Sequence, residues 1–117
     1  MASKPTHIGP CTLSYLKYLQ AKQKQHALAD IGAEETELLN AMALHWSAGK
    51  PLAVREAMEL KSLASPSTLH RRIANLKTLG WIADQNRSGN LRIKLLVPTA
   101  KALAYFDKMG RALASAV

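Results

Sequence analysis

The feature that most constrains the fold of this chain is a change of hydrophobic period at residue 80. Residues 65–79 carry the apolar side chains of Leu69, Ile73 and Leu76 at helical spacing. After Gly80 the period falls to two in the short runs WIADQNR and LRIKLLV, which the turn signal SGN separates. A helix followed at once by a β-hairpin predicts a mainly α domain with one small hairpin.

The helix expected over residues 65–79 has sequence signals at both ends. Ser65 is a typical N-cap because its hydroxyl can accept a hydrogen bond from a free backbone N–H of the first turn. Pro66 suits the first helical position, where its missing N–H costs nothing. Gly80 is a typical residue just beyond a helix C-terminus.

Four further helices are expected around this unit. The first runs from about Thr12, as N-cap, to Ala29, and the second lies in EETELLNAMALHWSAGKP, whose early acids suit the helix dipole. A third, shorter helix lies in LAVREAMEL, and Thr99 can cap a last helix in AKALAYFDKMGRALASA. The order helix, helix, short helix, turn, helix, hairpin, helix is that of a winged helix-turn-helix domain with flanking N- and C-terminal helices.

The 117 residues suit one core-bearing domain. We divide them into an N-terminal arm and helix (1–33), a winged helix-turn-helix domain (34–97) and a C-terminal helix (98–117). The outer two segments could mediate dimerisation. Their apolar side chains could form a dimer interface or an intramolecular core, and the sequence leaves both interpretations open. The side chains concerned are Leu13, Leu16, Leu19, Phe106 and Leu113.

The net charge of +8 is unevenly distributed along the chain. Residues 30–60 hold six acids against two bases, whereas residues 61–95 hold seven bases against Asp84 alone. A surface so poor in acids attracts polyanions, and this segment contains both the helix of residues 65–79 and the hairpin. Composition alone also fits a basic surface that only aids solubility.

The side of helix 65–79 opposite its apolar seam carries groups suited to duplex DNA. At about 100° per residue, that side is formed by Ser67, Arg71, Ala74 and Thr78. The small Ala74 would allow a close approach. The fork of Arg71 matches guanine O6 and N7 in the major groove, and Asn75 could pair with adenine.

The hairpin, residues 82–97, would act as a wing on the flanking minor groove or its phosphates. Ser67 and Thr68 could hold a phosphate at the helix N-terminus, and His70 is either a phosphate contact or an ordinary surface histidine. The full set of expected DNA-binding residues is Ser65, Ser67, Thr68, His70, Arg71, Arg72, Asn75, Lys77, Arg87, Asn90, Arg92 and Lys94.

Other chemistry is not indicated, and we expect neither an enzyme nor a bound cofactor. The four histidines show no pair at metal-ligand spacing, and there is no phosphate-binding glycine loop or nucleophile elbow. The single cysteine, Cys11, excludes an internal disulfide and could at most be a redox thiol. The start MASKPTHIGPCT lacks a signal-peptide core, and the apolar runs are too short for a membrane span, which predicts a cytoplasmic chain.

Residues 36–113 resemble the winged-helix domain of bacterial transcription regulators of the MarR type. The resemblance rests on LAVREAMELKSLASPSTLHRRIANLKTLGWI, within which SPSTLHRRI is the most telling stretch, and on LLVPTAKAL. The turn LKSLAS is one residue longer than the tightest pattern, and the hairpin tip NRSGNLR lacks the family's Asp-rich, Arg-Arg signature. The resemblance implies a homodimer held by the first and last helices and leaves room for an unidentified small-molecule effector.

The function expected from these observations is a sequence-specific, duplex-DNA-binding transcription regulator. Two copies on a pseudo-palindrome would extend the few base pairs that one recognition helix reads. Two alternatives stay open: a winged-helix protein–protein interaction module, and a plasmid or phage replication-initiation or partition protein.

Overall fold

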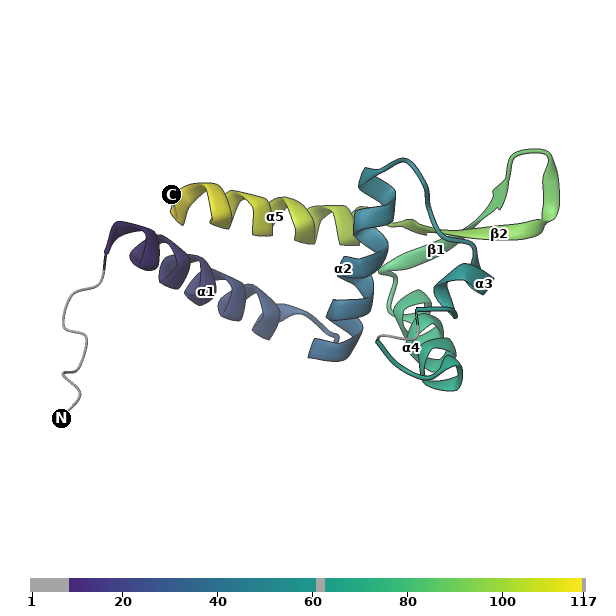
Figure 1. Cartoon of the computed structure of the whole chain (residues 1–117), viewed down its shortest axis with the longest axis horizontal. Helices are drawn as coiled ribbons and strands as arrows, with labels where there is room; N and C mark the ends of the chain where they lie inside the picture. Colours follow the sequence, from purple (N-terminus) through teal and green to yellow (C-terminus); the bar gives the residue numbers. More distant parts are fainter. Residues whose placement is uncertain (1–8, 61–62, 117) are drawn as a thin grey trace. The chain divides into compact units, whose positions relative to one another are not determined.

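The computed structural model describes residues 9–60 and 63–116 of the chain. Within them the fold is mainly α with one two-stranded antiparallel hairpin, as the sequence predicted (Figure 1). The elements are, in order, α1 (Pro10–Leu28), α2 (Ala33–Ser47), α3 (Val54–Ala57), α4 (Pro66–Thr78), β1 (Ile82–Arg87), β2 (Asn90–Pro98) and α5 (Ala100–Ala116).

Backbone contacts divide the chain into two compact units. One takes in α1 and the part of α5 from Ala104 onward, and the other runs from Asp30 to Leu103. The second unit contains α2, α3, α4, the hairpin and the first turn of α5. It therefore holds every element of the expected winged helix-turn-helix domain.

The core of the second unit forms where α2 packs against α4 and β2, and α4 packs against β1. α2 supplies three buried apolar side chains, and α4 buries the seam that its sequence predicted. The largest fully buried side chains are Leu38, Leu39, Met42, Leu69, Leu76, Ile82 and Leu96. Burial of such side chains removes apolar surface from water and fixes α4 against the rest of the unit.

The ends of α4 follow the sequence prediction. The Ser65 hydroxyl accepts a hydrogen bond from the backbone N–H of Thr68 at 3.4 Å and donates one to the Thr68 hydroxyl at 3.0 Å. At the other end Gly80 adopts φ +81°, which favours glycine. The N–H of Trp81 then reaches the carbonyl of Leu76 at 2.9 Å, closing the helix in a Schellman turn.

The start of α1 differs from the prediction. The helix begins at Pro10, with Gly9 as N-cap, so Thr12 lies inside the first turn and the predicted Thr12 cap is wrong. Proline at the first helical position needs no N–H partner and has its φ preset for the helix, which favours the earlier start. At the last helix the prediction is confirmed, because the Thr99 hydroxyl accepts from the N–H of Ala102 at 3.3 Å.

The hairpin has an irregular register that the sequence did not predict. Asn86 pairs with Lys94 and Arg87 with Asn90. Residues 91–93 of β2 therefore form a bulge opposite two adjacent residues of β1. Leu96 is fully buried in the regularly paired part of β2, whereas Leu91, within the bulge, is 85% exposed. The period of two in LRIKLLV predicts one apolar face formed by Leu91, Ile93 and Leu95. This prediction is wrong at Leu91, because the bulge interrupts the regular pairing there.

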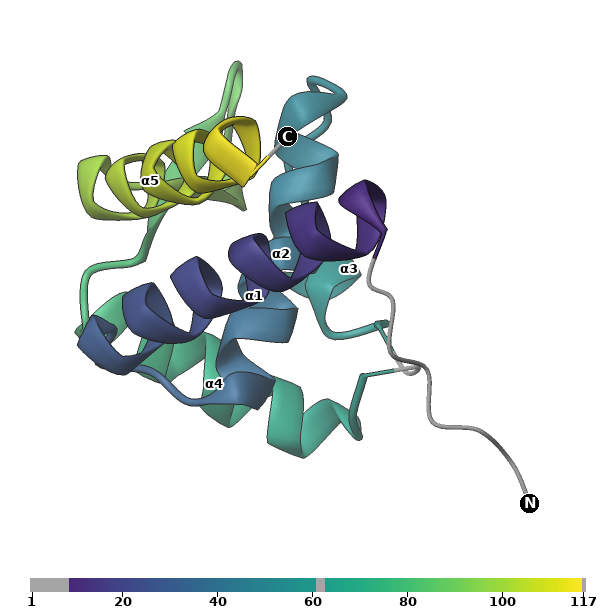
Figure 2. The same cartoon turned by 90° about the vertical axis from the view of Figure 1, so that its left-hand side faces the viewer.

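The first unit consists of α1 and most of α5, each an uninterrupted helix (Figure 2). Tyr105 and Phe106 meet edge to face at 5.8 Å between ring centroids. Burial, and to a smaller extent the neighbouring Tyr18, raise the pKa of the Tyr105 phenol above its usual 10.0. Over residues 9–60 and 63–116, no helix has the combined length and apolar character of a membrane span.

Leucines of both long helices face solvent in the single chain. The exposed fractions are 45% for Leu13, 38% for Leu16 and 53% for Leu113, while Leu19 and Phe106 are half-buried. The sequence places Ala27 on the same apolar seam as Leu13, Leu16 and Leu19, and its side chain lies outside the described residues. The exposed leucines are thus not part of an intramolecular core, which leaves them available to a partner surface.

Candidate nucleic-acid interface

The solvent side of α4 carries the residues that the sequence placed there. Ser67, Arg71, Ala74 and Thr78 are all exposed, as is His70 beside them. The arrangement follows from the helix itself, because burial of the Leu69, Ile73 and Leu76 seam turns the opposite side outward. No ion pair within the described chain engages Arg71, so its guanidinium is free to meet a ligand.

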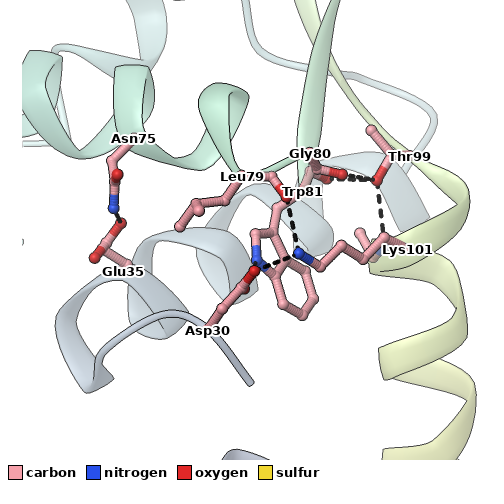
Figure 3. A network of polar contacts seen from close by, with 9 residues as sticks. Asp30, Glu35, Asn75, Leu79, Gly80, Trp81, Thr99 and Lys101 are labelled. Atoms are coloured by element: carbon pink, nitrogen blue, oxygen red, sulfur yellow. Dashed lines mark hydrogen bonds and ion pairs between the residues drawn. The ribbon is translucent and has the colours of Figure 1, made fainter. Parts of the chain in front are cut away.

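One flank of α4 is held by acids from the first turn of α2. The side-chain amide of Asn75 donates a hydrogen bond to the Glu35 carboxylate (Figure 3). Arg72 approaches Glu34 at 4.0 Å, and its side chain is only 19% exposed. Sequence analysis assigned these acids only a role at the helix dipole, because nothing local indicates that two residues 40 positions apart meet.

The other shoulder of α4 is tied to the hairpin. Lys77 forms an ion pair with Asp84 at 2.9 Å, and both side chains are about one-third exposed. The pair links α4 to β1 and engages Asp84, the only acid in the sequence of residues 61–95. Lys77 thus positions the wing in the free chain, whereas the sequence assigned it to DNA.

The wing presents four of the predicted residues, Arg87, Asn90, Arg92 and Lys94, and all are exposed. The Asn90 side chain accepts from the N–H of Arg92 at 2.9 Å, so it shapes the hairpin tip. Asn86, which the sequence did not single out, donates to the carbonyl of Leu91 at 2.8 Å and holds the bulge. The three wing cations therefore project from a backbone with fixed local geometry.

A polar cluster joins the C-terminal end of α4 to the first turn of α5 (Figure 3). Lys101 donates to Asp30 at 2.6 Å and to the carbonyl of Leu79 at 2.8 Å, and its ammonium lies 4.7 Å from the centroid of the Trp81 ring. The Trp81 indole N–H donates to Asp30 at 2.6 Å, and the Thr99 hydroxyl donates to the carbonyl of Gly80 at 2.5 Å.

The electrostatics of Asp30 follow from this cluster. The hydrogen bond from Lys101, followed by that from Trp81, holds the pKa of the Asp30 carboxyl below its usual 3.8. Lys101 also meets a carbonyl at the negative end of the α4 dipole. The cluster fixes where α4 ends and α5 begins, and sequence analysis missed it because its members lie far apart in the chain.

The ion pairs sort the cations on α3, α4, the wing and the first turn of α5 into two groups. Arg72, Lys77 and Lys101 are paired with acids. A second group makes no ion pair within the described residues, and it lies on α3, the solvent side of α4 and the wing: Arg55, Arg71, Arg87, Arg92 and Lys94. The arrangement leaves a continuous run of elements with uncompensated positive charge, suited to a polyanion.

Metal chemistry has no support in the described part of the chain, where no three His, Cys, Asp or Glu side chains converge. Cys11 is exposed on α1. The candidate site is therefore a binding surface built from α4 and the wing.

Comparison with solved structures agrees with the architecture. MepR from S. aureus, in a complex with DNA, matches with a TM-score of 0.65 and 16% identity, over 86% of this chain and 79% of that chain. The transcriptional regulator Tm0710 from Thermotoga maritima matches with a TM-score of 0.64 and 15% identity, over 86% and 67%. YusO from Bacillus subtilis matches with a TM-score of 0.55 and 18% identity, over 87% and 66%.

At these identities the likeness concerns the fold. The chain has the winged-helix fold of MarR-type proteins, which confirms the resemblance found in its sequence. No protein-family model matches the sequence, and no curated protein matches it either.

Proposed function

We propose that this chain is a sequence-specific transcription regulator that binds duplex DNA. The observation that carries the proposal is the distribution of unpaired cations. Arg71 stands on the solvent side of α4, and Arg87, Arg92 and Lys94 stand on the wing, while acids pair with Arg72, Lys77 and Lys101. A helix with a free arginine beside a basic wing suits the major groove and the flanking phosphates of one duplex.

The roles within the proposed interface differ by residue. Arg71 would read a guanine edge, because its guanidinium is unpaired and near the middle of the exposed face. Ser67 and His70 would contact phosphate, since both are exposed on α4. Asn75 would read adenine only after release from Glu35, because its amide donor is already engaged.

We further propose that the chain acts as a homodimer through α1 and α5. The exposed leucines of these helices, Leu13, Leu16, Leu103 and Leu113, support this because apolar side chains are costly to leave in water. A dimer presents two α4 helices and can read two half-sites of a pseudo-palindrome. Among the structural neighbours, MepR has been solved with DNA and Tm0710 is a transcriptional regulator, which is consistent with this function.

The test is a binding measurement followed by a selection. Fluorescence anisotropy with a labelled random-sequence duplex should show affinity that falls with salt, with a log–log slope of roughly −3 to −8 if several phosphates are neutralised. Selection from a randomised duplex pool should then enrich a pseudo-palindromic site. Absence of duplex binding at low salt would contradict the proposal and favour a protein-interaction module of the same fold. Enrichment of a DNA site without two-fold symmetry would contradict the proposal that a dimer reads two half-sites.

A further inference from the structure

A basic hollow lies between α3 and the wing, and Arg55 is the one basic residue of its lining not yet assigned to DNA. Its volume is about 450 Å³. Arg55 and Glu56 line it from the α3 side, and Arg87, Arg92 and Lys94 line it from the hairpin. In Figure 1, α3 lies between the wing and α4. Val54 of α3 lines this hollow and also a smaller one that His70 and Ala74 of α4 line.

The walls of the hollow are held together by backbone hydrogen bonding. The N–H of Leu96 in β2 donates to the carbonyl of Leu52 at 2.8 Å, and Ala53 forms an antiparallel bridge with Leu95. The segment that leads into α3 is thereby attached to the edge of β2. Arg55 is thus presented by a short helix whose start is fixed relative to the wing.

The wing contributes three cations to the hollow, Arg87 from β1 and Arg92 and Lys94 from β2. Successive side chains of a strand point to opposite faces, so Arg92 and Lys94, two positions apart, share one face. The register breaks between Lys94 and Asn90, and Ile93 lines the same hollow between them. The wing therefore gathers its positive charge on the side that faces α3.

The charge in the hollow is not compensated by the protein. Glu56 is the only carboxylate of the lining, and it accepts a hydrogen bond from the backbone N–H of Ala53 at 2.9 Å. In the described chain no ion pair joins Arg55, Arg87, Arg92 or Lys94 to an acid. Guanidinium groups bind the oxygens of a phosphate with two parallel hydrogen bonds, so a phosphate is the ligand that this lining best accommodates.

We propose that this hollow binds a phosphate of the DNA backbone and that Arg55 is one of its ligands. The proposal rests on the function proposed above. A strand that passes from the groove read by α4 to the groove touched by the wing crosses α3, where the hollow lies. Arg55 then anchors the duplex without reading its sequence, because phosphate contacts carry no base information.

The experiment compares Arg55→Ala with the matched control Lys108→Ala. Both substitutions remove one positive charge. Lys108 is an exposed residue of α5, on the side of the helix away from Leu103, Phe106 and Leu113. Duplex binding by fluorescence anisotropy across a salt series should give the wild type and Lys108→Ala the same slope. Arg55→Ala should flatten the log–log slope by about 0.9, the value for one phosphate, and weaken binding equally for different sequences. Circular dichroism should show the same helix content in all three proteins.

The outcomes separate this proposal from the proposed function. Wild-type binding with an unchanged slope in Arg55→Ala would overturn the phosphate site and leave the regulator intact. A loss confined to one duplex sequence would also overturn it, since a phosphate ligand is sequence-independent. Failure of the wild type to bind any duplex would overturn both. A second arm titrates inorganic phosphate and pyrophosphate by calorimetry. Arg55-dependent binding of these ions with duplex affinity unaffected would assign the hollow to a free phosphate ligand and refute the DNA role.

Discussion

The side-chain amide of Asn75 on α4 donates a hydrogen bond to the carboxylate of Glu35 on α2. An asparagine that reads adenine uses its amide as donor and its carbonyl as acceptor at the same time. Glu35 occupies the donor in the free chain and adds a negative charge beside the proposed DNA surface. Binding of DNA through Asn75 therefore has to break a contact inside the protein.

Substitution of Glu35 by alanine should strengthen DNA binding. The change releases the amide of Asn75 and removes a charge that repels phosphate, so we expect a several-fold gain in duplex affinity. Glu37→Ala is the control, because it removes the same charge from an exposed position on α2. Equal gains in the two variants, measured by anisotropy, would show that only net charge matters and that the contact with Asn75 has no effect.

Arg71 and Arg72 are adjacent in sequence but differ in what they can contact. Arg71 is exposed and unpaired within the described residues, whereas Arg72 is largely buried beside Glu34. Loss of a bidentate base contact costs about 1–3 kcal/mol, so Arg71→Ala should weaken binding of a selected site and relax its specificity. Arg72→Ala should change affinity much less. The prediction fails if competition assays find the larger loss in Arg72→Ala.

The difference in burial along β2 can be tested through stability. Leu96→Ala should lower the free energy of unfolding by about 2–5 kcal/mol, because Leu96 is fully buried and its truncation leaves a cavity. Leu91→Ala in the same strand should change it by less than about 0.5 kcal/mol, since Leu91 is exposed. Urea denaturation of both variants provides the measurement. A larger loss of stability in Leu91→Ala than in Leu96→Ala would contradict this assignment of the buried side chain.

The cluster around Asp30 predicts a dependence of stability on pH. Because hydrogen bonds from Lys101 and Trp81 lower the folded pKa of Asp30, its contribution is fully present above the unfolded value of about 3.8. The contribution disappears as the pH falls through the lower folded pKa. Asp30→Asn should therefore be less stable than wild type at pH 7, with a gap that shrinks below pH 3.8. An equal gap at pH 3 and pH 7 in urea titrations would argue against this origin.

The proposed dimer predicts a change of mass on substitution of an exposed leucine. Leu113→Glu places a charge among the exposed leucines of α5. We expect it to shift the chain from dimer to monomer in sedimentation equilibrium. Leu44→Glu is the control, because Leu44 is 73% exposed on α2 and belongs to the other unit. A wild-type protein that sediments as a monomer at micromolar concentration would rule out the dimer.

The sequence by itself determined the features that depend on neighbours along the chain. The cap at Ser65, the glycine at position 80 and the apolar seam of α4 are local signals, and they established the helix and its exposed face. The change of period after Gly80 established the hairpin. These features follow from backbone dihedrals and side-chain periodicity, which a few residues specify.

The tertiary structure alone decided which of the polar residues are engaged with one another. Asn75 and Glu35 lie 40 positions apart, Trp81 and Asp30 lie 51 apart, and Lys101 and Asp30 lie 71 apart. The burial of Leu96 likewise depends on how β2 pairs with β1 and lies against Trp46, whose indole N–H donates to the Leu96 carbonyl at 2.8 Å. Such contacts arise from packing of distant segments, so no local pattern of charge or hydrophobicity specifies them.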